Sequence, residues 1–273
     1  MTWHITDSVD HFLAGAGEFL RSRPVENTLL LTVSETVRER GPNAFGAEPA
    51  VFGWCDGGAF LRTPPRGALL SAMSPAAAAE LAGRLRDLPL PSVAGPDAVA
   101  EAFSREWQRR TGATPRVAGR LRLFRLAALV PPTPPAPGRA RVAVPRDRAL
   151  LLDWMNAFYQ EIGEPGPTDD IVDDRLSYGG LRLWEVDGEP VSMAGASRRE
   201  AGMVRVAAVY TPPEHRARGY AGAVTAAVSQ AALDEGAADV VLFTDLANPT
   251  SNALYQRIGY TPIEDRTLVE FAS

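Results

Sequence analysis

Two segments in the last third of the sequence contain residue types suited to binding a phosphate-bearing ligand. In residues 203–221, the apolar run MVRVAAVY leads through TPPEHRARGYA into an alanine-rich stretch. This order predicts a strand, an Arg/Gly loop and a helix, with several backbone N–H groups at the positive end of the helix dipole. Gly219 lets a ligand approach the backbone closely because it has no side chain. The loop therefore predicts a pyrophosphate site.

The second segment, residues 248–260, reads NPTSNALYQRIGY and predicts a polar loop followed by a short helix. A tyrosine such as Tyr255 suits proton donation, since its phenol has a pKa of about 10. Leu254, Tyr255 and Ile258 also stand at packing spacings, so a core tyrosine is the alternative interpretation. Asn248 and Ser251 suit either ligand contact or helix capping. We expect Asn248 to contact the ligand and Ser251 to cap the helix.

The elements expected around these segments alternate between strands and amphipathic helices. Apolar residues at alternate positions predict strands, and apolar residues three and four apart predict helices. In the second half, strands are expected at 139–144, 181–186, 190–197, 203–210, 240–244 and 266–271, and helices at 146–162, 169–178, 218–235 and 251–258. In the first half, strands are expected at 27–33, 51–62 (a hairpin), 67–73 and 116–129, and helices at 7–21, 74–86 and 99–110.

A proline-rich stretch, residues 131–138, separates the two halves. Repeated proline favours extended polyproline II and supplies few backbone donors, as in a linker. We therefore expect an N-terminal domain over residues 1–130 and a second domain over residues 139–273.

The composition narrows the classes of function. The 273 residues are 45% hydrophobic and 22% charged, which suits a globular protein with real cores. The net charge of −5 argues against a general nucleic-acid binder, which needs a basic stripe. The single cysteine, Cys55, argues against an internal disulfide and a cysteine zinc site. No window approaches a membrane span, so a cytoplasmic protein without membrane partners is expected.

These motifs, in this order, resemble the GCN5-related N-acetyltransferase (GNAT) superfamily. RARGYA at residues 216–221 is similar to its acyl-CoA motif Q/R-x-x-G-x-G/A, and residues 248–260 are similar to its N-x-x-(x)-N/S-x-x-L-Y-x-x-x-G-F/Y segment. The amino-acid sequence of the two motifs is most similar to the glycine N-acyltransferase-like branch. The resemblance runs from residue 140 to the end. It implies an α/β (α+β) fold with a mixed, mostly antiparallel sheet flanked by helices.

The resemblance implies an N-acetyltransferase that uses acetyl-CoA as co-substrate and no metal. The acetyl group would pass directly to a small amine or peptide amine in a ternary complex, with Tyr255 beside the sulfur as the catalytic residue. The implied cofactor-binding residues are Val209, Tyr210, Thr211, Arg216, Ala217, Arg218, Gly219, Tyr220, Ala221, Asn248 and Asn252. A non-catalytic acyl-CoA sensor or assembly module is the alternative, and the oligomeric state stays open.

A general base is harder to identify. Relatives often place a glutamate on strand four or five, whereas strand four here has Arg205, Ala207 and Ala208. We name Glu161 as the first catalytic candidate, although a solvated surface position is the favoured interpretation of Glu161, Glu164 and Glu185 alike. The other candidates are a water relay or the side chains of Glu164 and Glu185.

Aspartates at positions 169, 170, 173 and 174 stand where relatives line the acceptor site. They would attract a cationic amine, but a solvated helix start explains them as well. Helices 146–162 and 169–178 and the loop at 163–167 are expected to hold the acceptor, whose identity stays open.

The first half is expected to be a degenerate second copy in a tandem GNAT arrangement. The hairpin, strand and helix of residues 51–86 repeat the order of residues 181–235. Residues 73–77 read MSPAA at the position of the phosphate loop, without Arg or Gly. The first half is therefore expected to lack a CoA site.

Overall fold

The computed structural model describes residues 2–164, 166 and 169–272. Two compact units form. The N-terminal unit comprises Met1–Leu123, Thr244–Asn248 and Pro262–Ser273, and the C-terminal unit comprises Phe124–Phe243 and Pro249–Thr261. Strands β6 (Thr114–Leu126) and β12 (Tyr260–Ala272) therefore contribute residues to both units.

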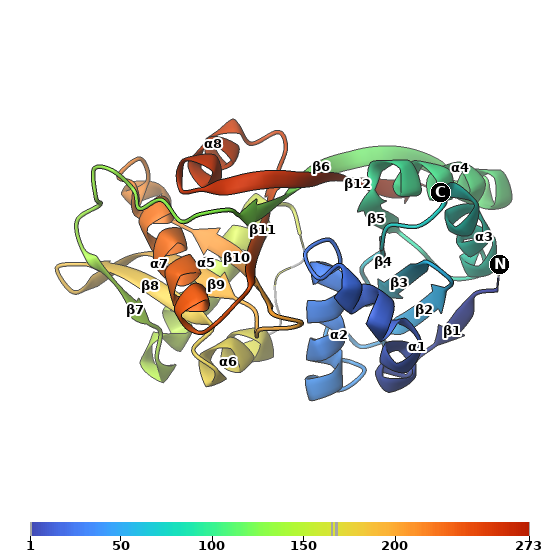
Figure 1. Cartoon of the computed structure of the whole chain (residues 1–273), viewed down its shortest axis with the longest axis horizontal. Helices are drawn as coiled ribbons and strands as arrows, with labels where there is room; N and C mark the ends of the chain where they lie inside the picture. Colours follow the sequence, from blue (N-terminus) through green and yellow to red (C-terminus); the bar gives the residue numbers. More distant parts are fainter. Residues whose placement is uncertain (1, 165, 167–168, 273) are drawn as a thin grey trace. The chain divides into compact units, whose positions relative to one another are not determined.

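The N-terminal unit contains a mixed sheet with helices (Figure 1). Its strands neighbour one another in the order β1 (His4–Thr6), β2 (Val51–Cys55), β3 (Gly58–Arg62), β4 (Ala68–Leu70), β5 (Ser92–Pro96) and β12. Strands β4 and β5 are parallel, and the other pairs are antiparallel. The helices are α1 (Val9–Ser22), α2 (Thr28–Arg40), α3 (Pro75–Leu85) and α4 (Asp97–Thr111).

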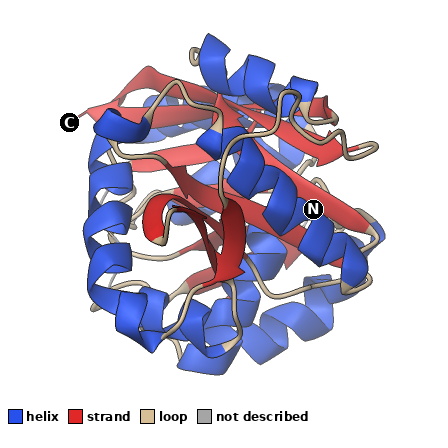
Figure 2. Ribbon diagram, turned by 90° about the vertical axis from the view of Figure 1, so that its left-hand side faces the viewer, coloured by secondary structure: helices blue, strands red, loops and turns tan. Residues whose placement is uncertain are grey.

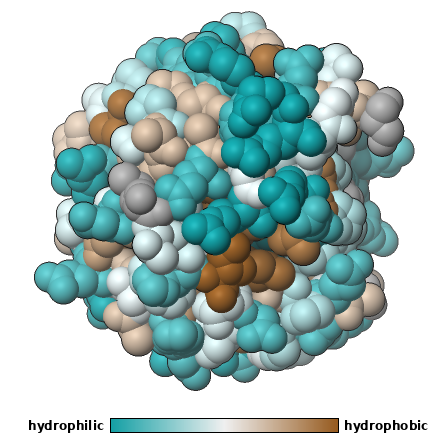
Figure 3. Space-filling model, turned by 90° about the vertical axis from the view of Figure 1, so that its right-hand side faces the viewer, coloured by the Kyte–Doolittle hydropathy of each residue, from teal (hydrophilic) through white to brown (hydrophobic). Residues whose placement is uncertain are grey.

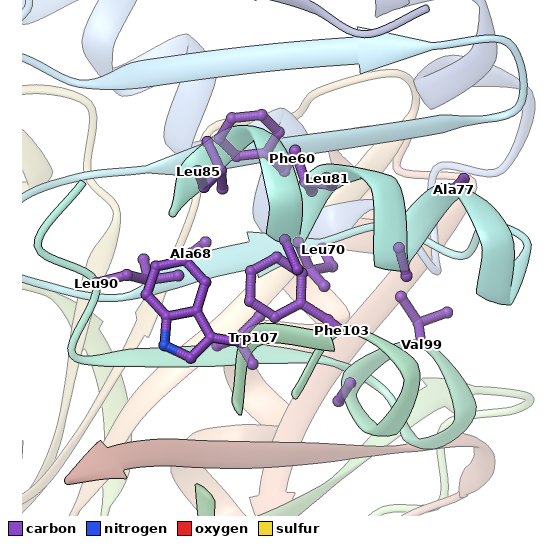
Figure 4. Close-up of a cluster of buried hydrophobic side chains, with 14 of the residues drawn as sticks. Phe60, Ala68, Leu70, Ala77, Leu81, Leu85, Leu90, Val99, Phe103 and Trp107 are labelled. Atoms are coloured by element: carbon purple, nitrogen blue, oxygen red, sulfur yellow. The ribbon is translucent and has the colours of Figure 1, made fainter. Parts of the chain in front are cut away.

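A large aromatic and aliphatic cluster fills the space between α3, α4 and this sheet. Phe60, Leu70 and Leu81 are buried there together with Phe103 and Trp107, and Figure 4 shows their side chains directed toward one another. The rings of Phe103 and Trp107 stack with centroids 5.8 Å apart. Hydrophilic residues predominate on the face seen in Figure 3, with apolar groups gathered in small areas. Burial of this cluster stabilises the N-terminal unit by removing apolar surface from water.

The strand predicted at residues 27–33 is wrong, because this segment belongs to helix α2. A short apolar run cannot be assigned to strand or helix by its periodicity alone. Here the helix extends to Arg40, and the buried Leu30, Leu31 and Val37 pack against α1 and the sheet. The short strands β1 and β5 were not predicted, since β5 lies in the proline-containing sequence PLPSVAGP.

The C-terminal unit has the predicted order of elements. Its strands neighbour one another in the order β11 (Asp239–Asp245), β10 (Met203–Tyr210), β9 (Glu189–Ala196), β8 (Leu181–Val186) and β7 (Arg139–Val142). Its helices are α5 (Arg148–Glu161), α6 (Asp169–Ser177), α7 (Tyr220–Asp234) and α8 (Pro249–Arg257), with 3-10 turns at Pro145–Asp147 and Pro213–His215. Helix α7 packs on β8, β9 and β10, and α5 packs on β10; helices flank the strands in Figure 2.

The strand predicted at residues 266–271 exists, and its partner lies in the N-terminal unit. It is part of β12, which pairs antiparallel with β5 from Arg266 opposite Pro96 to Glu270 opposite Ser92. Val269 is 5% exposed and belongs to the same core as Phe103. Residues near the end of the chain thus complete the core of the unit that contains its beginning.

Replacing Val269 by alanine tests this arrangement. We expect the free energy of unfolding to fall by about 1–3 kcal/mol, because two buried methyl groups leave a cavity among α3, α4 and β5. Urea unfolding followed by tryptophan fluorescence measures the change. Ile263→Ala is the control, since Ile263 lies on the same strand and is 42% exposed. Equal losses for the two variants would contradict the assignment of Val269 to this core.

Candidate functional site

Strand β10 changes its pairing halfway along its length. Its first half, from Met203 to Val206, pairs parallel with Asp239 to Leu242 of β11. On its other side, the pairing with β9 shifts register between Ala207 and Tyr210. Ala208, inside this shift, has a φ of +53°, which is uncommon for a residue with a side chain. These features describe a β-bulge with one extra residue in β10.

The bulge changes the face to which the side chains of β10 point. Val204 and Val206 lie in the core beneath α7. Regular alternation would place Ala208 and Tyr210 on the same face, yet both are buried in the core beneath α5 and α6. The ring of Tyr210 lies 6.2 Å from that of Trp154 on α5. The extra residue therefore turns the end of β10 toward the helices on the opposite face.

Hydrogen bonds hold the end of β10 in place. The buried hydroxyl of Ser192 donates to the carbonyl of Tyr210 at 3.0 Å and lies 2.8 Å from the hydroxyl of Thr211. The Nε atom of Arg216 donates to the carbonyl of Thr211 at 2.9 Å. Val209, half-buried, packs at the edge of the core beneath α7. The strand end predicted to contact pantetheine is thus well fixed.

The loop after β10 has the backbone geometry of an anion-binding nest. Ala217 has a φ of +60° and Gly219 a φ of +82°, so left-handed conformations occur two residues apart. Such alternation turns successive N–H groups toward one point. Helix α7 begins at Tyr220, and no side chain in the described part of the chain caps its first turn. The N–H groups around Arg218 and Ala221 therefore suit an anionic ligand.

The start of helix α3 in the N-terminal unit differs from that of α7. Helix α3 begins at Pro75, and the side chain of Ser74 accepts a hydrogen bond from the N–H of Ala77 at 3.1 Å. The N–H group of Ala77, which an anion at this helix end would need, is therefore already bound by the side chain of Ser74. The helix and cap predicted for this segment are confirmed.

The structure brings the two predicted segments together within the C-terminal unit. A Cβ atom added at Gly222 in the first turn of α7 would lie 2.9 Å from Cδ1 of Leu254 on α8. Glycine at this position therefore permits close packing of the two helices. Tyr255 is adjacent to Leu254, so α8 carries it near the first turn of α7.

Tyr255 lies in an aromatic environment beside α7. Its ring centroid is 6.5 Å from that of Phe124 and 6.1 Å from that of Tyr260, and the side chain is buried. Desolvation raises the pKa of Tyr255 to about 12. The phenol therefore stays protonated at neutral pH and can donate a hydrogen bond. The packing role considered in the sequence analysis is thus present, and it is compatible with chemistry at the hydroxyl.

The other residues of the 248–260 segment lie close to the start of α8. Asn248 directly precedes the helix, and its N–H donates to the carbonyl of Asp245 at 3.0 Å. Ser251 is the third residue of α8, so the prediction that it caps the helix is wrong. Asn248 occupies the cap position because α8 begins at Pro249, two residues earlier than predicted. Asn252 is half-buried, one turn before Tyr255.

Glu161 forms an ion pair with Arg216, in the loop before α7. Its carboxylate accepts a hydrogen bond from Nη2 of Arg216, and both side chains are nearly half exposed. This hydrogen bond raises the pKa of Arg216, whose guanidinium also lies 5.9 Å from the ring centroid of Tyr210. The guanidinium is thus turned back toward α5, and the backbone of the loop carries the anion-binding geometry.

The two further candidates for a base lie in different surroundings. Glu164 is exposed, after the end of α5. Glu185 is only 8% exposed, so its assignment to a solvated surface is wrong. It accepts a hydrogen bond from Arg141, which also binds Asp147 through two hydrogen bonds. Arg141 holds the pKa of Asp147 below its usual range, and this buried cluster joins β7 to β8.

The acidic residues of α6 are largely engaged in ion pairs. Asp173 accepts two hydrogen bonds from Arg148, and Asp174 accepts two from Arg198. Asp170 is exposed, while the side chain of Asp169 and part of the 163–167 loop lie outside the described residues. The negative charges of Asp173 and Asp174, which were considered for attracting a cationic amine, are therefore already paired with arginines. His215 lies in the turn Pro213–His215.

Nothing in the sequence indicated Arg175 on α6, and Arg205 drew attention only because it stands where a carboxylate was expected. Both lie on the side of the sheet that faces α5 and α6. The available signal was an arginine inside the apolar run MVRVAAVY, where a solvated side chain is not expected.

Two kinds of feature are absent from the described residues. No group of three or more His, Cys, Asp or Glu side chains there is arranged to hold a metal ion. None of the helices in residues 2–164 and 169–272 has the length and hydrophobicity that crossing a bilayer requires.

The buried phenol of Tyr255 predicts a loss of stability at alkaline pH. As the pH rises above about 10, the unfolded chain releases this proton before the folded chain does, so stability falls until the folded pKa is passed. In Tyr255→Phe, the fall in unfolding free energy between pH 8 and pH 11 should be smaller by about 1 kcal/mol. Urea unfolding at both pH values measures it. Identical falls in the two proteins would show that Tyr255 titrates normally.

Comparisons with known proteins agree with this architecture. Residues 148–260 match the family model described as Acetyltransferase (GNAT) family. None of the curated proteins compared with the chain matches it significantly. Three solved structures resemble nearly the whole chain, each at 16% identity or less, a level that shows a shared fold alone.

A Drosophila protein has a TM-score of 0.69 at 16% identity, covering 99% of this chain and 98% of its own. A GCN5-related N-acetyltransferase from Sphaerobacter thermophilus has a TM-score of 0.65 at 16% identity, covering 98% and 95%. A tandem GNAT protein from the clavulanic acid biosynthesis pathway has a TM-score of 0.59 at 12% identity, covering 100% and 99%. The chain therefore has a GNAT fold, and its residues 148–260 are similar to the acetyltransferase (GNAT) family.

Proposed function

We propose that this protein is an acyl-CoA-dependent N-acyltransferase that moves an acetyl group from acetyl-CoA directly to an amine. The observation that carries the proposal is the bulge at Ala208, which follows the last residue of β10 paired with β11, Val206, and precedes the loop at residues 216–221 by one short turn. Unpaired strand groups suit an extended amide-bearing arm, and the nest suits a pyrophosphate. Acetyl-CoA contains both chemical groups, separated by its pantetheine.

The donor would lie along one continuous run of the chain. Val209, Tyr210 and Thr211 would pair with the amides of the pantetheine, and residues 216–221 would bind the pyrophosphate through their N–H groups. Asn248 and Asn252 would contact the pantetheine near the reacting end. Gly219 would contribute by keeping the loop free of a side chain and in its left-handed conformation.

Transfer requires an amine without its extra proton and a way to stabilise the leaving thiolate. Tyr255 would donate a hydrogen bond to the sulfur, since its phenol stays protonated far above neutral pH. Glu161 and a water relay are the proposed routes for the proton of the amine. The ion pair between Glu161 and Arg216 holds that carboxylate at the phosphate loop, which favours the relay as the final link to the amine.

We further propose that the two halves of the sequence have different roles. The second half, residues 139–273, would carry the catalytic site, and the first half, residues 1–130, would be a degenerate GNAT copy without CoA. In support, β4 and β5 are parallel, as β10 and β11 are, and α3 follows β4 as α7 follows β10. The cap by Ser74 leaves less room for an anion at α3. Kinship with the glycine N-acyltransferase-like branch also remains a proposal.

A non-catalytic acyl-CoA sensor is the second candidate function. It is favoured by Arg205 and Ala207, which occupy strand positions where a carboxylate would serve as base. Thiol release from acetyl-CoA in the presence of amines, amino acids, polyamines and peptides separates the two functions. Tight acetyl-CoA binding without release for any acceptor would support the sensor and reject the transferase.

Replacing Gly219 by valine tests the nest. A β-branched residue strongly disfavours a φ of +82°, so the loop should rearrange and acetyl-CoA affinity should fall at least about 100-fold. Isothermal titration calorimetry measures the affinity.

Gly188→Val is the matched control for this variant. Gly188 has a φ of +87° in the β8–β9 turn, with no atom within 4 Å of an added Cβ. It imposes the same backbone strain outside the proposed site, so acetyl-CoA binding should persist. If Gly219→Val also bound acetyl-CoA normally, the nest would not be the pyrophosphate site.

Tyr255→Phe tests the proposed role of the hydroxyl. Turnover should fall about 10- to 1,000-fold, the range expected when one general acid or transition-state hydrogen bond is removed. Acetyl-CoA affinity should change little, since the ring and its packing remain. Steady-state thiol release and calorimetry provide the two values. Unchanged turnover would remove Tyr255 from the mechanism.

A further inference from the structure

The proline-rich segment at residues 131–138, which we call the strap, packs on the first turn of α7. A Cβ atom added at Gly219 would lie 3.7 Å from Cβ of Ala136, and one added at Gly222 would lie 3.8 Å from Cγ of Pro132. Both are ordinary van der Waals distances. All four residues belong to the C-terminal unit, and Figure 1 shows the strap as the green segment between β6 and β7. The strap therefore lies beside the nest.

Both ends of the strap are fixed. The N–H group of Val130, directly before the strap, donates to the carbonyl of Ile258 at 3.0 Å. At the other end, Nε1 of Trp184 on β8 donates to the carbonyl of Pro137 at 2.8 Å. Gly138 has a φ of +105°, and an added Cβ would lie 2.1 Å from a backbone carbonyl oxygen of β8, so only glycine fits there. The segment predicted to be a linker is thus held against the C-terminal unit.

Proline makes the strap stiff between these two ends. Positions 131, 132, 134, 135 and 137 are proline, so φ is restricted and five N–H groups are missing. Side-chain contact therefore holds the middle of the strap on α7: Pro132 and Ala136 are half-buried, whereas residues 133–135 are exposed. A stiff segment loses little conformational entropy when a ligand binds against it. The strap has the properties of a preformed wall.

The proposed path of the donor brings one end of acyl-CoA to the strap. The pantetheine would run from the nest along Val209 to Thr211, so the nucleotide would leave the nest on its other side, at the first turn of α7. Gly219 and Gly222, at this turn, are the two residues in contact with the strap. An adenosine that leaves the nest here would lie against Pro132 and Ala136.

We propose that the strap is a wall of the donor site and binds the 3′-phosphoadenosine end of acyl-CoA. The faces of adenine are flat and apolar, and the side chains of Pro132 and Ala136 offer apolar surface without a polar group that would need a partner. The segment that connects the two halves of the sequence thus also positions the donor. This inference rests on the proposed function for the place of the pyrophosphate, and on the contacts of the strap for the place of the nucleotide.

Two ligands test the proposal by isothermal titration calorimetry. One is acetyl-CoA, and the other is S-acetyl-4′-phosphopantetheine, which keeps the thioester, the pantetheine and one phosphate but lacks the adenosine and its 3′-phosphate. Gly138→Ala should displace the strap, because the added Cβ meets the carbonyl of β8. Its affinity for acetyl-CoA should fall about tenfold, since the apolar contact with adenosine is lost. Its affinity for the shorter ligand should stay unchanged.

A second variant and a matched control make the test specific. Trp184→Phe keeps an aromatic ring on β8 but removes the N–H that holds Pro137, so it should weaken acetyl-CoA binding in the same selective way. Gly188→Ala is the control, since Gly188 has a φ of +87° with no atom within 4 Å of an added Cβ. It imposes similar backbone strain away from the strap, and both affinities should persist. Circular dichroism shows whether each variant is folded.

The outcomes distinguish this inference from the proposed function. Unchanged acetyl-CoA affinity in the folded strap variants would overturn the inference and leave the acyltransferase in place. Equal losses for both ligands would also overturn it, because the strap would then support the nest and not the nucleotide. If the intact protein bound neither ligand, the proposed function would be rejected and this inference with it.

Discussion

The extra residue at Ala208 is the constraint on which the rest of the C-terminal unit depends. A sheet with regular pairing would satisfy the backbone of β10 on both sides and leave no groups for an extended ligand. The bulge ends the pairing with β11 after Val206 and turns Tyr210 toward α5. The strained backbone at Ala208 is held by packing on both faces and by the hydrogen bond from Ser192 to Tyr210. One inserted residue thus determines both where the strand opens and which core its end joins.

Ion pairs of two arginines join neighbouring elements of the C-terminal unit. Arg216 joins the loop before α7 to Glu161 at the end of α5, and Arg141 joins β7 to β8. Exposed ion pairs contribute little to stability, since water screens them and the side chains lose freedom. Their effect here is to restrict orientation: the guanidinium of Arg216 is directed toward α5, which leaves the loop backbone to carry the binding geometry. Arg175 differs from these residues because its buried Nη1 atom has no such partner in the described residues.

The path of the chain connects the two units through shared strands. Residues of β6 and β12 belong to both units, and β12 returns to pair with β5. A cut within residues 131–138 would therefore separate β12 from the sheet that it completes. Val269 shows the physical reason, since it is buried with Phe103 and Trp107 in a core built mainly from the first half. Neither unit is formed by one continuous stretch of the sequence.

By itself, the sequence determined the order of elements in the second half, because local periodicity, turn residues and helix starts are properties of neighbouring residues. It also indicated the phosphate loop and the nearby tyrosine, since a short motif needs only a strand, a glycine and a helix around it. Tertiary structure decided what depends on distant partners. Residues 27–33 became helical through packing against α1, Glu185 was buried and paired with Arg141, and β12 joined β5. The bulge at Ala208 and the place of Arg175 above Gly195 likewise arise only when strands and helices far apart in the sequence meet, because register and burial are set by their partners.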